Sequence, residues 1–176
     1  VNAENYDSEA TIFDNSCIYS DRIFNVPGEY EKIQYAIFFA SSQDTVLVQP
    51  GTYYEDIDFA GKDIAIISTD GPESTFIIAN TEDGGGGGVY EPDESVVTIA
   101  DVTSNQAVLD GFTLQNGYGK GVNFEYFISV ASDPEAFNDM MYNYIKSGGV
   151  AVINSSVTLS NLIIQNNTAR NFGAGI

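Results

Sequence analysis

The chain has 176 residues, which is enough for one domain with a substantial core. It carries 25 acidic and 6 basic residues, a formal net charge of −19, so it repels the phosphates of nucleic acids and, unaided, acidic polysaccharides. The single cysteine, Cys17, excludes an internal disulfide bond, and the lack of histidine excludes histidine-based catalysis and histidine-ligated metals.

The chain begins with Val1 and contains no apolar targeting segment, so we expect a processed or excised chain. No apolar stretch approaches the length of a membrane span. An acidic surface fits extracellular, salty or calcium-containing surroundings, and plain solubility is the alternative explanation. From these features we expect a secreted protein that lies outside the cell or on its surface.

Residues 1–22 form an acidic N-terminal extension with two short strand-like islands, Ala10–Phe13 and Cys17–Tyr19. A short strand is predicted over Ile23–Val26. Pro27 and Gly28 then precede a helix predicted over residues 29–42, and two serines end it. The apolar residues on one face of this helix are Tyr30, Ile33, Ala36, Ile37 and Ala40.

After Gln43 the apolar residues recur at every second position, which is typical of strands. Strands are predicted at Val46–Gln49, Asp56–Phe59 and Ile64–Ser68, separated by Pro-Gly-Thr and Ala-Gly-Lys turns. Further alternating pairs are Phe76 and Ile78, Val97 and Ile99, Phe112 and Leu114, Val150 and Val152, Val157 and Leu159, and Leu162 and Ile164. Because no second helical pattern lies between most of these strands, the sequence predicts an all-β protein.

Two internal matches indicate a repeat. The stretch "LDGFTLQN" (Leu109–Asn116) resembles "LSNLIIQN" (Leu159–Asn166) at an offset of 50 residues. The stretch "GGV" (Gly148–Val150) matches "AGI" (Ala174–Ile176) at an offset of 26 residues. One structural coil is therefore predicted to hold about 26 residues, and the longer offset to hold one coil plus an insertion of similar size.

The residues at the ends of the repeated strands fit sharp corners. Gly111 in one copy corresponds to Asn161 in the other, and Asn116 corresponds to Asn166. Glycine and asparagine most readily adopt the left-handed backbone conformation that such a corner requires. Stacked asparagines can also form hydrogen bonds from one coil to the next, so we interpret them as structural.

Strands that turn without pairing with their sequence neighbours must pair with the next coil. The sequence therefore predicts a parallel β-helix over residues 23–176. The helix at 29–42 precedes the first coil, and we expect it to cover the N-terminal end of the core.

The segments "VPGEYEKIQYAIFFASSQDTVLVQPGTYYEDIDFAGKDIAIIS", "LDGFTLQNG" and "SSVTLSNLIIQNNTARNFGAGI" resemble the right-handed parallel β-helix family. This is the pectate-lyase-like superfamily, in its secreted bacterial and environmental branch. The resemblance covers residues 23–176 and implies a right-handed helix. It implies no single activity, since the family includes pectate lyases, pectin methylesterases, polygalacturonases, alginate epimerases, phage tailspikes and non-catalytic adhesins.

The loop Thr81–Glu94 combines acidic side chains with five glycines, a composition that suits a calcium site. No EF-hand spacing is present, and an acidic loop without a ligand is the alternative. The candidate calcium ligands are Glu82, Asp83, Glu91, Asp93 and Glu94.

The segment Gly117–Ser147 is the least repeat-like and is interpreted as an insertion. Insertions on solenoids often form the binding surface, so its aromatic side chains are predicted to contact a glycan or a partner protein. A small satellite core is the alternative. The aromatic residues are Phe124, Tyr126, Phe127, Phe137, Tyr142 and Tyr144.

No catalytic residue is predicted. The resemblance implies that a lyase would need an Arg or Lys base, and only Lys120, Lys146 and Arg170 lie near the elaborated part of the chain. The pair Asp56 and Asp58 has the spacing of two carboxylates on one strand face, but side chains at these positions are expected to point to water.

The segment "GAGI" at 173–176 starts another coil, so we expect the last rung to be covered by further coils of this chain or by another copy. The N-terminal extension is predicted to add a strand to a neighbouring subunit, which would build a head-to-tail filament. A strand folded back on its own β-helix is the alternative. The predicted assembly residues are Ile12, Phe13, Ile18, Tyr19 and Ile176.

The sequence thus favours a non-catalytic, extracellular structural or adhesive β-helix module. Such a module would form filaments of its own copies or belong to a larger surface protein, with a glycan as a second partner class. A polysaccharide-active enzyme, either a lyase or a glycoside hydrolase, is the alternative.

Overall fold

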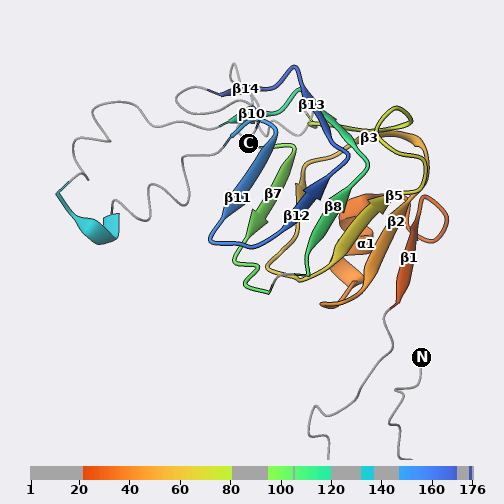
Figure 1. Cartoon of the computed structure of the whole chain (residues 1–176), viewed down its shortest axis with the longest axis horizontal. Coiled ribbons are helices and arrows are strands. Elements are labelled where there is room, and N and C mark those ends of the chain that lie inside the picture. Colours follow the sequence, from red (N-terminus) through yellow and green to blue (C-terminus); the bar gives the residue numbers. More distant parts are fainter. Residues whose placement is uncertain are drawn as a thin grey trace, which may run out of the picture.

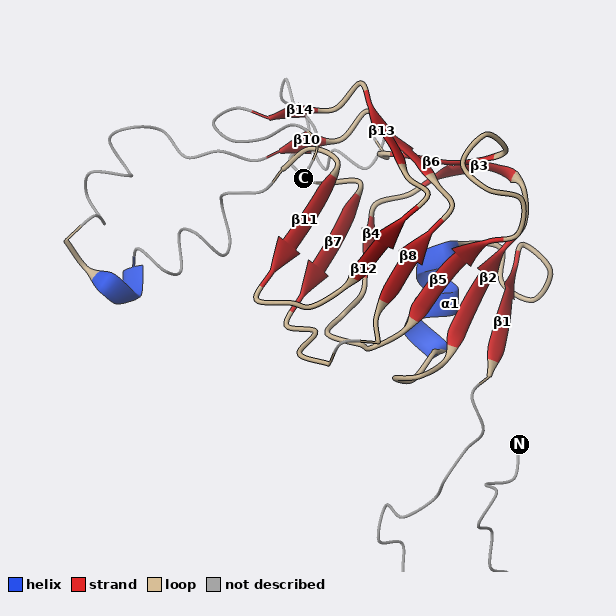
Figure 2. Cartoon of the chain, in the orientation of Figure 1, coloured by secondary structure: helices blue, strands red, loops and turns tan. Residues whose placement is uncertain are grey.

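The computed structural model describes residues 22–80, 95–104, 106–119, 132–136, 147–169 and 175. They form short strands, the helix α1 (Ile33–Phe39) and a short helical stretch at residues 134–136, as Figure 1 and Figure 2 show. Every strand pair among these residues is parallel. The predicted predominance of β-structure is therefore confirmed.

The strands form three main sheets and one small one. Sheet A contains β1 (Ile23–Val26), β2 (Thr45–Val48), β5 (Ala65–Ser68), β8 (Val108–Asp110) and β12 (Thr158–Ser160). Sheet B contains β3 (Gly51–Tyr54), β6 (Thr75–Ile78), β9 (Thr113–Gln115) and β13 (Ile163–Gln165). Sheet C contains β4 (Ile57–Asp58), β7 (Val97–Ala100) and β11 (Val150–Ile153), and the small sheet contains β10 (Tyr118–Gly119) and β14 (Thr168–Ala169).

From β2 onward, strands that follow one another in the chain lie in different sheets. The chain visits sheets A, B and C in turn and then repeats the visit, and one such visit is called a pass below. The first pass uses β2, β3 and β4, the second β5, β6 and β7, and the third β8, β9 and β11. Each pass therefore gains its strand hydrogen bonds from the passes before and after it.

The predicted 50-residue repeat corresponds to strand pairing between successive passes. Leu109 is paired with Leu159 in sheet A, and Leu114 is paired with Ile164 in sheet B. The shorter match is also supported, because the Val150 amide donates to the Gly175 carbonyl at 2.9 Å. The Val97 amide likewise donates to the Gly149 carbonyl at 3.1 Å, one pass earlier.

The predicted corner residues adopt the left-handed conformation. The φ angles are 87° at Gly111 and 48° at Asn161, and they are 66° at Asn116 and 56° at Asn166. Side-chain hydrogen bonds link the corners of adjacent passes, since the Asn161 amide donates to Asp110 at 2.8 Å. The corner asparagines therefore have a structural role.

Inward-facing side chains stack in columns through the passes. One column of register partners joins Phe24, Val46, Ile66, Leu109 and Leu159. Its first four members are 0–5% exposed, so the column fills the space enclosed by the sheets. Burial of such a column is the main stabilising contribution to the fold.

Two details of the strands do not follow from the sequence pattern. In strand β6 the alternating residues Phe76 and Ile78 are only partly buried. The other two residues of the strand, Thr75 and Ile77, are fully buried. The register of β6 decides this, because Ile77 stands between Tyr53 of β3 and Leu114 of β9, which both face the core.

The second detail is the stretch 51–54, which the sequence pattern places largely in a turn and which forms strand β3. The corner between β2 and β3 is thus only Gln49 and Pro50, so only Pro50 of the predicted separator Pro-Gly-Thr lies outside a strand. Tyr53 faces the core from β3 and donates its hydroxyl to the Gln49 carbonyl at 2.9 Å.

Helix α1 is shorter than the predicted range 29–42, although the predicted buried face is correct for Ile33, Ala36 and Ile37. The chain before it forms a turn, because the amides of Glu29 and Tyr30 both donate to the Asn25 carbonyl, at 2.8 and 3.1 Å. The helix packs against β1, β2 and β4 at the β1 end of the sheets, as Figure 1 shows.

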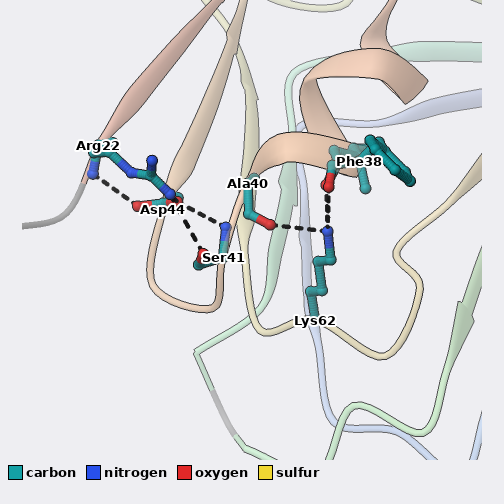
Figure 3. Close-up of polar contacts among 7 residues, drawn as sticks. Arg22, Phe38, Ala40, Ser41, Asp44 and Lys62 are labelled. Carbon is teal, nitrogen blue, oxygen red and sulfur yellow. Dashed lines mark hydrogen bonds and ion pairs between the residues drawn. The ribbon is translucent and has the colours of Figure 1, made fainter. Parts of the chain in front are cut away.

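Residues of the first pass and of the corner after it hold both ends of α1. The buried Glu55 carboxylate accepts the first helical amides, those of Ile33 and Gln34, each at 3.0 Å. The Lys62 ammonium donates to the carbonyls of Ile37, Phe38 and Ala40 at 2.7–2.9 Å, two of which Figure 3 shows. A negative group at the helix start and a positive group at its end both stabilise the helix.

Burial raises the pKa of Glu55 above its ordinary value, although the hydrogen bonds from Gln34 and Ile33 and the charge of Lys32 oppose this change. Burial also lowers the pKa of Lys62, although the charge of Asp44 opposes it. Both groups are thus partly removed from water where they form the hydrogen bonds that hold the helix on the sheets.

The side chain of Gln34 covers the free edge of sheet C. Its amide nitrogen donates to the Asp58 carbonyl at 3.1 Å, and its oxygen accepts the Asp58 amide at 2.8 Å. β4 is the edge strand of its sheet, so Gln34 supplies the pair of hydrogen bonds that a further strand would supply.

Candidate functional site at the corner of the two insertions

The longest connections of the described passes start at the same corner, between sheets B and C. The first pass crosses this corner with two residues, Glu55 and Asp56, between β3 and β4. The second pass crosses it with residues 79–96, and the third crosses it with residues 116–149. Residues 81–94 of the second pass are called the first insertion below, and residues 120–146 of the third pass are called the second insertion. Successive passes therefore enlarge one corner and leave the connections from sheet A to sheet B short.

The predicted ligand-binding residues lie in these two insertions. The candidate calcium ligands Glu82, Asp83, Glu91, Asp93 and Glu94 fall within 81–94, and the aromatic residues Phe124, Tyr126, Phe127, Phe137, Tyr142 and Tyr144 fall within 120–146. All of them lie outside the described residues, as do the predicted assembly residues Ile12, Phe13, Ile18, Tyr19 and Ile176. Their predicted roles therefore stay predictions.

The bases of the two insertions are joined by hydrogen bonds. The Ser95 hydroxyl, after the first insertion, donates to the carbonyl of Ser147, after the second. The next amide, that of Val96, donates to the Gly148 carbonyl at 3.0 Å. Ser95 and Ser147, the described residues directly after 81–94 and 120–146, thus lie next to each other, which the sequence pattern did not predict.

Glycines make this close approach possible. A β-carbon on Gly117 would lie 1.9 Å from the Gly148 carbonyl oxygen, and one on Gly148 would lie 2.4 Å from that of Thr168. A β-carbon on Gly149 would lie 2.5 Å from the Gly175 carbonyl oxygen. The sequence pattern indicates only that such glycines start coils. The close approach could have been predicted from their positions, because Gly117 precedes the second insertion and Gly148 and Gly149 follow it.

The chain that follows the second insertion carries no charge of its own. Residues 147–169 contain no Asp, Glu, Lys or Arg, although the whole chain carries a net charge of −19. Among the described residues no three acidic or cysteine side chains gather into a candidate metal site. A cation between the insertions would therefore depend on carboxylates from the insertions themselves.

The carboxylates of the pair Asp56 and Asp58 form local hydrogen bonds. Asp56 accepts the Asn80 amide at 3.3 Å, and Asp58 accepts the Ala60 amide at 2.7 Å. Asp58 is exposed and Asp56 is partly exposed, as the sequence predicts for side chains that point to water.

Two of the basic residues in the described part hold the N-terminal end of the fold together. Lys62 binds the end of α1, and Arg22 forms an ion pair with Asp44 at 2.9 Å, which Figure 3 shows. The Asp44 carboxylate also accepts the amides of Ser41 at 2.7 Å and of Arg22 at 2.9 Å. Arg22 and Lys62 therefore have structural roles.

Burial by itself raises the pKa of Asp44, but the hydrogen bonds from Ser41 and Arg22 and the Arg22 charge outweigh burial, so the pKa lies below its ordinary value. Such a group stabilises the fold above the unfolded pKa of an aspartate, and this stabilisation is lost as the pH falls through the folded pKa. Asp44→Asn is expected to lower the free energy of unfolding at pH 7 by about 1–2 kcal/mol.

Urea unfolding of both proteins between pH 7 and pH 3 checks this. The difference between the wild type and the Asp44→Asn variant should shrink as the pH falls below about 4. A difference that stays constant with pH would show that the Asp44 charge does not stabilise the fold.

The edge of the last described pass is apolar and partly exposed. Leu159, Leu162 and Ile164 are partly exposed, whereas their counterparts Leu109, Phe112 and Leu114 are 0% exposed. A hollow at this edge is lined by Val152, Ser155, Ser156, Val157, Thr158 and Leu159. Whether further coils or another copy cover this edge stays a prediction.

No protein-family model, curated protein or solved structure matches the chain. Among the described helices none is long and apolar enough to span a membrane.

Proposed function

We propose that the chain forms a right-handed parallel β-helix in which α1 covers the N-terminal end of the core. The register of the passes supports this, because each strand from β2 to β9 in sheets A and B pairs with the same-sheet strands of the neighbouring passes. The contacts of α1 with β1, β2 and β4, and the Gln34 bonds at the edge of sheet C, support the covering role.

We further propose that this β-helix is a non-catalytic structural or adhesive module of an extracellular protein or assembly. One observation carries this proposal: both long insertions start at the same corner of adjacent passes, with their bases hydrogen-bonded. A rigid stack that presents two joined insertions on one corner is suited to contact with a surface.

The composition of the insertions suggests the class of partner. The first contributes five carboxylates within residues 81–94, and the second contributes six aromatic side chains within 120–146. Carboxylates beside glycines suit a calcium ion, and aromatic rings suit the apolar faces of sugar rings. Because the chain is strongly acidic, an acidic glycan would need the calcium ion as a bridge.

Retention of the full chain on immobilised pectin, alginate and a neutral glucan, with and without about 1 mM calcium, tests this function. We expect retention on one of them without release of sugars, and a loss of about tenfold in affinity for Tyr142→Ser. Tyr54→Ser is the matched control, since Tyr54 is 64% exposed on β3 and belongs to neither insertion. Equal effects of the two variants would contradict a binding role of the insertion.

The alternative function is that of a polysaccharide lyase or hydrolase. It is favoured by the position of Lys120 and Lys146 within the connection 116–149, and of Arg170 directly after β14, whose partner β10 lies in the same connection. Release of unsaturated uronic acids or of reducing ends in the same assay, abolished by replacing these bases, would establish the enzyme and refute the non-catalytic proposal.

A further inference from the structure

The outward face of α1 is an exposed aromatic surface. Tyr35, Phe38 and Phe39 are 54%, 73% and 57% exposed, and they lie on the side opposite the buried Ile33, Ala36 and Ile37. The helix contains no charged residue, so it is apolar on nearly all sides. A helix of this kind is typical of a buried position, and a contiguous exposed apolar surface marks a contact site.

A row of ring contacts connects this face with the start of the described chain. The Arg22 guanidinium lies 5.1 Å from the ring centre of Phe24. From Phe24 the row continues through Tyr30 and Phe39 to Phe38, with ring centres 5.5, 5.6 and 5.2 Å apart. Figure 3 shows Arg22 and Ser41 beside the end of the helix that carries Phe38.

Residues 1–21 join the chain at this place and carry suitable side chains. The large apolar side chains of the first island, Ile12 and Phe13, lie nine to ten residues before Arg22, and those of the second, Ile18 and Tyr19, lie three to four residues before it. An extended chain covers about 3.3–3.6 Å per residue, so both islands reach a helix that is about 10 Å long. The tether gives the islands an effective concentration on the order of millimolar at the helix, which a second copy rarely reaches.

The charges are compatible with this contact. Residues 1–21 hold five acidic and no basic residues, and α1 itself has no carboxylate to repel them. Lys32, directly before the helix, lies 5.7 Å from the ring centre of Tyr35 and provides a positive charge at the margin of the face.

We propose that residues 10–19 pack across the outward aromatic face of α1 of their own chain. The two apolar islands cover Tyr35, Phe38 and Phe39, and the N-terminal extension thereby completes the cover over this end of the sheets. The extension that was predicted to join a neighbouring subunit is then an intramolecular element.

Disulfide trapping tests the proposal, because Cys17 is the only cysteine and is the first residue of the second island. The test compares Phe38→Cys, on the face, with Ser42→Cys, which is exposed and lies beyond the end of the helix, next to the Ser41 that Arg22 contacts. If residues 1–21 were only tethered at Arg22 and did not dock on the helix, Cys17 would react faster with position 42, which lies nearer to Arg22. We expect Cys17 to form its intramolecular disulfide at least fivefold faster in the Phe38→Cys variant than in the Ser42→Cys variant.

Adding Phe13→Asp to the Phe38→Cys variant should remove this preference, because it places a charge where the island meets the aromatic face. Faster trapping at position 42, or trapping at position 38 that ignores Phe13→Asp, would overturn the proposal. Disulfide-linked dimers as the main product would overturn it as well and would favour the intersubunit role. None of these outcomes depends on whether the insertions bind a glycan.

Discussion

The Gly117→Ala variant is expected to lose about 3 kcal/mol in its free energy of unfolding. A methyl group at this position would lie 1.9 Å from the Gly148 carbonyl oxygen and 2.7 Å from the Val96 side chain. Backbone at this corner cannot move aside freely, since the Val96 amide donates to the same Gly148 carbonyl at 3.0 Å. Urea unfolding followed by circular dichroism measures the change.

Gly28→Ala is the matched control. The nearest atom to a β-carbon on Gly28 is 3.6 Å away, which is ordinary contact, and its φ is not in the left-handed region. This variant should change the free energy of unfolding by less than about 1 kcal/mol. Equal losses for the two variants would show that the bases of the insertions are not in close contact.

Leu109→Ala and Leu159→Ala form a second pair with a large predicted difference. The two leucines occupy equivalent places in successive passes and are register partners, but Leu109 is fully buried and Leu159 is partly exposed. Leu109→Ala is expected to cost about 3–4 kcal/mol, because a cavity remains between two neighbouring passes. Leu159→Ala should cost about 1 kcal/mol, because its side chain is already partly exposed.

The same unfolding measurement on both variants checks this prediction. Similar losses would mean that Leu159 is as enclosed as Leu109, so that a further layer covers the last described pass. A small loss at Leu109 would contradict the stacked core itself.

The repeat is visible in the sequence because both its apolar positions and its corners recur. Leu109 and Leu159 pair as predicted, and Gly111 and Asn161 share the left-handed corner. Side-chain size and left-handed conformations are local properties, so one sequence can reveal them.

Features that depend on another pass are not predictable in the same way. The predicted helix ends are wrong because Glu55, more than twenty residues away, supplies the acceptor for the first helical amides. The buried face of β6 is not predictable because Phe76 and Ile78 are apolar on one face and Ile77 on the other, and only the register with β3 and β9 selects Ile77. The contact of residues 95–96 with residues 147–148 has the same origin, since it requires the assignment of every strand to its sheet.

The stacking of passes by parallel strands is the claim on which the proposals depend. Asn25, Leu47, Ile67, Asp110 and Ser160 are successive register partners across sheet A. Spin labels at Asn25→Cys and at one further position, in a Cys17→Ser background, measure their separations by electron paramagnetic resonance. The distance should grow by about 4.8 Å per strand, to roughly 19 Å at Ser160. A Ser160 label closer to Asn25 than the Asp110 label is, or distances without this order, would contradict the stacked arrangement.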